Sequence, residues 1–95
     1  MITSVEPGIY RPGQWGVRIE NLVLNVAAEK NSFGDFLRFE TLTLCPIDTH
    51  CIEHGLLSRQ EVDWLNHYHA EVRRRLQPLL DGAARDWLLQ ATKPI

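Results

Sequence analysis

The sequence has little of what would mark several common classes of protein. It contains only two cysteines, Cys45 and Cys51, in 95 residues, too few for the disulfide framework of a small secreted domain. It has no apolar run near the roughly 18 residues that a membrane-spanning helix needs. The start, Met1 followed by Ile-Thr-Ser, lacks the basic and apolar regions of a signal peptide. We therefore expect no membrane contact and a cytoplasmic location.

The chain also has almost no excess of positive or negative charge. The formal net charge is −2 at pH 7, and the one basic run, residues 73–75, is short. The chain thus lacks the positive surface that is typical of nucleic-acid-binding proteins, and we expect no nucleic acid partner. The length fits one small domain.

The first half has the composition of strands and turns. β-branched and apolar residues are frequent in 2–5, 17–27 and 36–44, which predicts three strands. Proline and glycine recur in 6–16, which predicts a loop there.

The second half is helical in character. Ser58 and Glu61 have the spacing of a capping box, and apolar residues at helical spacing follow. Pro78 predicts the end of this helix, and Asp81 is placed to cap a second, shorter helix. The expected fold class is α+β, an antiparallel β-meander followed by C-terminal helices.

Two carboxylates stand out by their surroundings. Glu6 ends the first predicted strand, and Glu20 lies among apolar residues in the middle of the strongest one, on the same strand face as Arg18. A chain reversal at 12–13 would bring both carboxylates together, where a hard divalent cation would relieve their repulsion. The residues alone also fit a simpler interpretation, in which Glu6 lies on the surface and Arg18 and Glu20 form an ion pair.

Four potential zinc ligands lie within ten residues of one another: Cys45, His50, Cys51 and His54. Their spacing does not match the usual paired zinc knuckles. The pattern therefore favours incidental residues on a connector, with a structural zinc site as the alternative. His69 lies on the apolar stripe of the first helix, which favours a core position, and His67 lies off the stripe.

Four stretches of the chain resemble one family of enzymes. Residues 6–10 are Glu-Pro-Gly-Ile-Tyr and 16–21 are Gly-Val-Arg-Ile-Glu-Asn; residues 39–48 and 64–69 follow at family separations. Together they resemble the C-terminal portion of the "pita-bread" (creatinase/aminopeptidase) metallopeptidases, in particular the aminopeptidase P branch. The resemblance implies that 1–44 is the C-terminal part of a catalytic domain. It also implies that 45–95 is a connector and helical extension, the two forming one continuous folded unit.

The resemblance also implies roles for individual residues. In the family, two divalent metal ions are held by two Asp, one His and two Glu. Glu6 matches the first of these Glu ligands and Glu20 the second, which bridges the ions. Arg18 matches a position that orients the bridging carboxylate, and Tyr10 would lie near the substrate cleft. The implied metal is Mn²⁺, with Zn²⁺ or Co²⁺ as alternatives, and the implied substrate is a peptide with a penultimate proline.

The chain departs from the family pattern in one respect. The Asp and His ligands precede the first Glu in the family, whereas Asp35, Asp48 and all four histidines follow Glu20 here. We therefore expect that these 95 residues alone bind metal weakly or not at all and have no peptidase activity.

The family resemblance and the missing ligands together leave two possible functions. In the first, the chain is part of a dimetal Xaa-Pro aminopeptidase, a hydrolase, and supplies Glu6 and Glu20. In the alternative, it is a non-catalytic remnant that acts only in folding or dimerisation. We expect a homodimer through the helical end, and exposed apolar surface around Val17, Ile19 and Val23.

Overall fold

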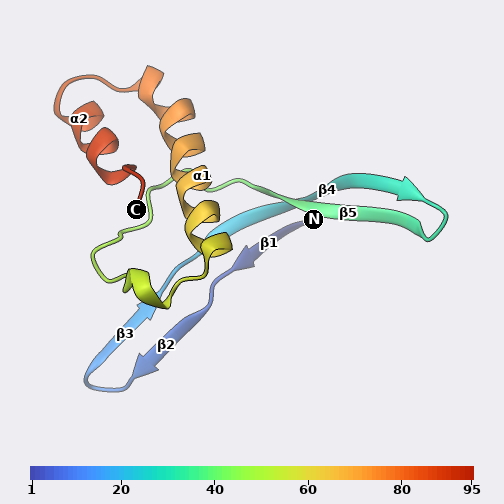
Figure 1. Cartoon of the computed structure of the whole chain (residues 1–95), viewed down its shortest axis with the longest axis horizontal. Coiled ribbons are helices and arrows are strands. Elements are labelled where there is room, and N and C mark those ends of the chain that lie inside the picture. Colours follow the sequence, from blue (N-terminus) through green and yellow to red (C-terminus); the bar gives the residue numbers. More distant parts are fainter. The chain divides into compact units, whose positions relative to one another are not determined.

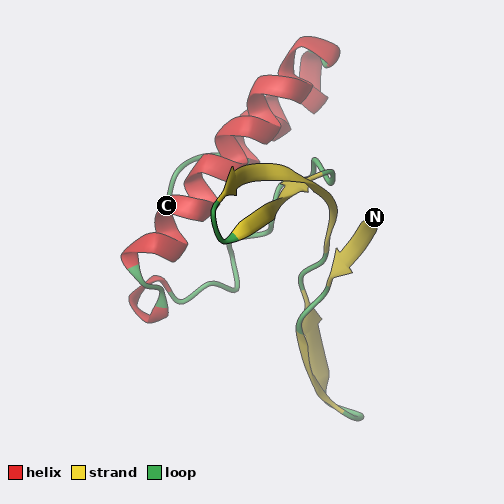
Figure 2. Ribbon diagram, turned by 90° about the vertical axis from the view of Figure 1, so that its right-hand side faces the viewer, coloured by secondary structure: helices red, strands yellow, loops and turns green.

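A computed structural model describes residues 1–95, and it places all strands before all helices along the chain (Figure 1). The strands are β1 (Ile2–Val5), β2 (Gly8–Arg11), β3 (Trp15–Arg18), β4 (Asn21–Asn31) and β5 (Gly34–Thr41). The helices are the short 3₁₀ turns η1 (His54–Leu56) and η2 (Gln77–Leu79) and the α-helices α1 (Arg59–Leu76) and α2 (Gly82–Ala91). Figure 2 separates the two classes by colour.

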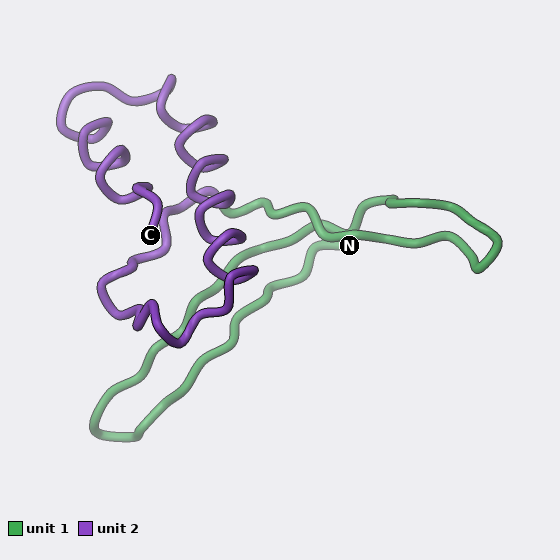
Figure 3. Tube along the Cα trace, in the orientation of Figure 1, with its two compact units in different colours: residues 1–43 green, residues 44–95 purple.

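The chain divides into two compact units, Met1–Thr43 and Leu44–Ile95 (Figure 3). The first contains all five strands and the second all helices.

The strands of the first unit form two antiparallel ladders. β1, β4 and β5 make a three-stranded sheet in the order β1-β4-β5, and β2 pairs with β3 in a separate ladder. The chain turns back twice, at 12–14 between β2 and β3 and at 32–33 between β4 and β5. The stretch β1–β2 therefore runs antiparallel to β3–β4, and β4 pairs on its other side with β5. The predicted α+β class and antiparallel meander are confirmed.

The strand predicted over 36–44 lies at Gly34–Thr41, and two differences from the prediction are larger. The loop expected over 6–16 contains β2, and the single strand expected over 17–27 is divided between β3 and β4. The first difference arises because Pro12 and Gly13 form a tight turn between two strands: Gly13 has φ 73°, a conformation that glycine adopts without steric cost. The second difference lies at Glu20 and is the basis of the candidate site.

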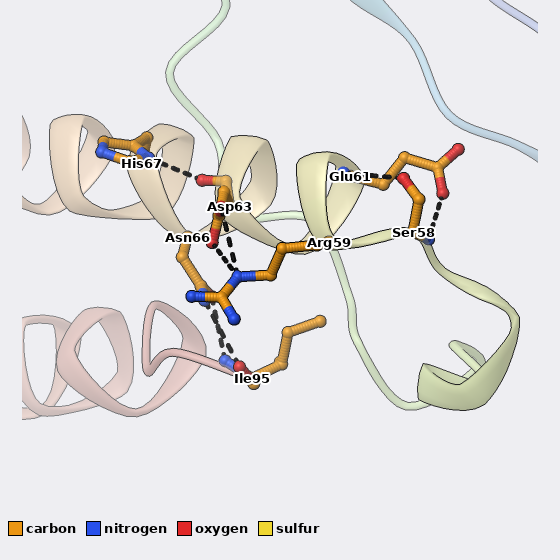
Figure 4. A network of polar contacts seen from close by, with 7 residues as sticks. All are labelled: Ser58, Arg59, Glu61, Asp63, Asn66, His67 and Ile95. Atoms are coloured by element: carbon orange, nitrogen blue, oxygen red, sulfur yellow. Dashed lines mark hydrogen bonds and ion pairs between the residues drawn. The ribbon is translucent and has the colours of Figure 1, made fainter.

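The second unit begins its main helix with the predicted capping box. The Glu61 amide donates to the Ser58 hydroxyl, and the Glu61 carboxylate accepts from the Ser58 amide (Figure 4). These bonds satisfy amides that have no partner within the helix. α1 ends at Leu76, just before Pro78, as predicted. Asp81 does precede α2, but its side chain makes no capping bond.

The apolar core of this unit is small and depends on α1 and α2. Tyr68, Val72 and Leu88 are buried, and four partly buried side chains pack against them: Leu44, Ile47, Leu76 and Leu80. His69 is fully buried beside Tyr68, as its place on the apolar stripe predicted, and His67 is exposed.

Side chains of α1 also hold the backbone of the connector that leads to it. The Tyr68 hydroxyl donates to the Cys45 carbonyl at 3.0 Å and accepts from the Cys45 amide at 3.3 Å. His69 Nε2 accepts from the Ile47 amide at 3.0 Å. These two neighbouring side chains therefore take the place of a strand partner for residues 45–47, whose backbone groups would otherwise lose hydrogen bonds on burial.

The C-terminal tail is held to α1 in the same way. The Asn66 amide group donates to the Ile95 carbonyl oxygen and accepts from the Ile95 amide (Figure 4). Arg73 donates to the Thr92 carbonyl at 3.1 Å. Polar side chains on α1 thus fix both segments that flank the helices.

The buried His69 makes the stability of this unit depend on pH. Burial lowers the pKa of His69 from its usual value of 6.5, and the charge of Arg73 lowers it further. The unfolded chain therefore takes up a proton near pH 6.5, whereas the folded chain takes it up only at lower pH. Stability is fully present above that pH and decreases as the pH falls below it, with a slope that approaches about 1.4 kcal/mol per pH unit.

We predict that His69→Gln, which keeps a hydrogen-bond acceptor but cannot titrate, flattens this dependence between about pH 7 and 5. Urea unfolding followed by far-ultraviolet circular dichroism measures it. The matched control is His67→Gln, at an exposed position two residues earlier, which should keep the slope of the unsubstituted protein. An equal slope in both variants would contradict the assignment to His69.

Candidate metal centre

The candidate site lies where the strand ladder of the first unit is interrupted. On one side of the gap Val5 pairs with Asn21, and on the other Gly8 pairs with Arg18. Two residues separate these pairs on each strand, 6–7 and 19–20, so the register passes through the gap without a shift. This register sets Glu6 opposite Glu20.

Pro7 explains why the ladder is interrupted at this point. The Ile19 amide donates to the Pro7 carbonyl at 3.3 Å, but Pro7 has no amide hydrogen with which to return the bond. Pro7 and Ile19 therefore occupy a hydrogen-bonded position with only one of its two bonds. Because such positions alternate along antiparallel strands, the next pair, Glu6 and Glu20, is of the non-hydrogen-bonded type.

That pair type puts the two carboxylates opposite each other on one face of the strands. In non-hydrogen-bonded pairs the Cα atoms are about 4.5 Å apart and the side chains lie on the same face. Like charges directly opposite destabilise a sheet. An Arg18 guanidinium nitrogen lies 3.8 Å from a Glu20 carboxylate oxygen and offsets part of this repulsion, but both side chains are substantially exposed, so the ion pair is weak.

The same face of the β2–β3 ladder carries Tyr10, which lies across two glycines. A Cβ atom built on Gly16, the residue opposite Tyr10, would lie 2.7 Å from the Tyr10 ring. A Cβ on Gly8 would lie 2.6 Å from the Tyr10 hydroxyl oxygen. The ring therefore occupies the space that side chains at both positions would take, and its hydroxyl end is directed toward Gly8, two residues from Glu6.

The opposite face of this hairpin is apolar. Alternation along each strand puts Val5, Ile9, Val17 and Ile19 on the side away from the carboxylates, and all four are between 44% and 64% exposed. The hairpin thus separates its charged residues from its apolar ones.

The sequence-based prediction was wrong about the surroundings of Glu20. Glu20 lies in the gap between β3 and β4 and is exposed, not buried in the middle of a strand. The expected chain reversal at 12–13 does occur, and the predicted Arg18–Glu20 pair is present. The apolar pattern of 17–27 could not reveal the gap, because its cause is Pro7 on the opposite strand.

The cysteine and histidine residues of the connector form no comparable cluster. Across residues 1–95 no group of three or more His, Cys, Asp or Glu side chains is arranged to hold a metal ion, and Cys45 and Cys51 are both free thiols. His50 instead contacts Asp48. The two glutamates are likewise too few to form a complete metal site by themselves.

Comparison with known proteins identifies the family of the chain. The family model described as the C-terminal region of peptidase_M24 matches residues 35–95. The chain belongs to this family. None of the helices combines the length and the apolar composition that a membrane span requires.

This M24 C-terminal chain spans only a small part of the length of the relatives that it matches. It is 46% identical over 100 residues to a protein of Coprinopsis cinerea named "Probable Xaa-Pro aminopeptidase P", covering 100% of this chain and 16% of that protein. It is 48% identical over 99 residues to aminopeptidase P2 of Arabidopsis thaliana, covering 100% of this chain and 14% of that protein. The 95 residues therefore correspond to the C-terminal portion of Xaa-Pro aminopeptidases.

A solved structure supports the same assignment for the fold. The X-prolyl aminopeptidase of Caenorhabditis elegans, described as a cytosolic enzyme with a di-nuclear active site, matches 99% of this chain and 16% of its own at 37% identity and a TM-score of 0.84. The expected pita-bread fold is thereby confirmed for this portion.

We predict that Gly16→Ala displaces the Tyr10 ring, because the new methyl group would lie within 2.7 Å of it. The exposed ring can swing outward, so the loss of stability should be small, below about 1 kcal/mol. The chemical shifts of the Gly8 Hα protons report the displacement. The ring shields these protons in the unsubstituted protein, and NMR should show that the shielding is lost in the variant.

The matched control is Gly55→Ala, where the nearest atom would be at an ordinary contact distance of 3.5 Å. Gly8→Ala provides the reciprocal experiment, with the Hα protons of Gly16 as the reporter. Unchanged glycine shifts in both variants would show that the Tyr10 ring does not lie across the strands.

Proposed function

We propose that this chain supplies Glu6 and Glu20 as metal ligands to the active site of a dimetal Xaa-Pro aminopeptidase, a hydrolase that removes the residue before a penultimate proline. The observation that carries the proposal is the uninterrupted register that sets two carboxylates opposite each other at the gap in the ladder. The relatives named Xaa-Pro aminopeptidase and the di-nuclear site of the C. elegans enzyme support it.

The donor set fits a hard divalent cation. Carboxylate oxygens are the ligands that Mn²⁺ and Mg²⁺ prefer, and a cation between Glu6 and Glu20 would convert their repulsion into attraction. Both side chains are exposed, so neither must break a buried contact to bind. Mn²⁺ is the proposed metal, with Zn²⁺ and Co²⁺ as alternatives.

The other residues of this face have supporting roles in the proposal. Bound metal ions would polarise the peptide carbonyl and lower the pKa of a bound water. Arg18 would hold the Glu20 carboxylate in one orientation through the contact already present. Tyr10 would present its hydroxyl to the substrate at the edge of the site. Residues 1–95 provide only two of the five ligands that the family resemblance implies, so the proposed catalysis needs a longer chain.

Self-association is the second candidate function. The exposed Val17 and Ile19 favour it, as expected, whereas Val23 is only 6% exposed and contributes nothing to such a surface. A homodimer through the helical end and a cytoplasmic location remain predictions.

We predict that Mn²⁺ added to the 95-residue chain selectively broadens the NMR signals of the amides around Glu6 and Glu20, with weak, millimolar affinity because most ligands are missing. Either Glu6→Gln or Glu20→Gln should remove the effect, since each leaves a single carboxylate. Glu29→Gln, at an exposed position in β4, removes the same charge elsewhere and should leave the broadening unchanged.

A Xaa-Pro peptide assay on the same samples tests the second part of the proposal. We expect no cleavage by this chain alone. Broadening centred on other residues would refute the metal site, and metal-dependent cleavage would refute the claim that further ligands are required.

A further inference from the structure

A groove of about 510 Å³ lies within the second unit, between the connector and α2. Residues 46–50 form one wall, and Trp87, Gln90 and Ala91 form the other. The volume is in the range of pockets that bind small molecules or peptide side chains. None of these residues takes part in the candidate metal centre.

Asp48 provides a fixed negative charge at this groove. Its Oδ1 atom accepts from the His50 amide at 2.9 Å and from His50 Nδ1 at 2.6 Å. These hydrogen bonds lower the pKa of Asp48, so the carboxylate is ionised at neutral pH. Both bonds end on Oδ1, which leaves Oδ2 able to accept from a ligand.

The end of α2 adds negative potential on the other wall. Gln90 and Ala91 are the last two residues of the helix, where its carbonyl groups concentrate partial negative charge. The last turn contains no basic side chain of its own, and the Arg73 guanidinium, which donates to the Thr92 carbonyl just beyond the helix, offsets part of this charge. Lys93 lies beyond the helix end and does not line the groove.

Trp87 gives the groove an aromatic surface that solvent can reach. Its side chain lies on α2, one turn before the helix end, and is 59% exposed. The face of an indole ring attracts cations, and planar guanidinium groups stack on it.

We propose that this groove binds the guanidinium group of an arginine side chain presented by a peptide segment of a partner protein. A guanidinium carries several donors in a flat fork, which suits the free carboxylate oxygen of Asp48, and its plane suits the Trp87 ring. A metal ion fits less well, because the groove offers a single carboxylate and no cluster of ligands. The contacts are solvent-exposed, so one arginine should bind in the millimolar range.

An NMR titration of the 95-residue chain with the acetylated and amidated tripeptide Gly-Arg-Gly tests the proposal. We expect saturable shifts of the Trp87 indole signal and of the amides of Asp48 and Ala91. The indole signals of Trp15 and Trp64 should not move and so serve as internal references. The same peptide with citrulline, which has the shape of arginine without its charge, should bind at least tenfold more weakly, and the lysine peptide more weakly than the arginine peptide.

Two variants separate the carboxylate from general charge effects. Asp48→Asn should weaken arginine binding at least threefold, whereas Asp86→Asn, which removes the same charge next to Trp87 but outside the groove, should leave it unchanged. Trp87→Leu should weaken binding without loss of the Trp15 and Trp64 signals that report folding. The proposal is wrong if no saturable shift occurs, if citrulline or lysine binds as well as arginine, or if Asp48→Asn binds normally.

Discussion

The missing amide hydrogen of Pro7 is the constraint on which the candidate metal centre depends. It removes one bond from the ladder that would otherwise run through β1–β2 and β3–β4, and the ladder is interrupted at this point. The register is nevertheless kept on both sides, because the tight turn at 12–14 fixes it from one end and the β1–β4 pairing from the other. Glu6 and Glu20 are thereby placed opposite each other, on the same face of the two strands.

The two units reach their structures by different means. In the first, main-chain pairing positions the functional side chains, and the alternation of strands separates them from the apolar face. In the second, the apolar core is small, and side chains of α1 hold the neighbouring backbone instead: Tyr68 and His69 bind the connector, and Asn66 binds Ile95. The connector so held forms one wall of the groove beside α2.

Local signals in the sequence predicted the helical unit well. The capping box at Ser58, the helix end before Pro78 and the core position of His69 all follow from short-range rules. The strand unit was harder to predict from the sequence. β2 begins with a glycine, and the residue that interrupts the ladder at Glu20 lies on the opposite strand. Glu20 was expected in a strand interior because its own neighbours are apolar; only the pairing with Pro7 reveals the gap. The groove could not be predicted at all, since residues 46–50 and α2 are about forty residues apart in the sequence.

The proposed metal centre requires that Glu6 and Glu20 face each other as a non-hydrogen-bonded pair, and NMR can test this directly. In such a pair the two Hα protons point toward each other across the strands. We predict a strong cross-strand NOE between the Hα protons of Glu6 and Glu20, together with equivalent NOEs between Ser4 and Leu22 and between Gly8 and Arg18. An NOE from Glu6 Hα to the Hα of Ile19 or Asn21 instead would show a shifted register and would contradict the proposed metal centre.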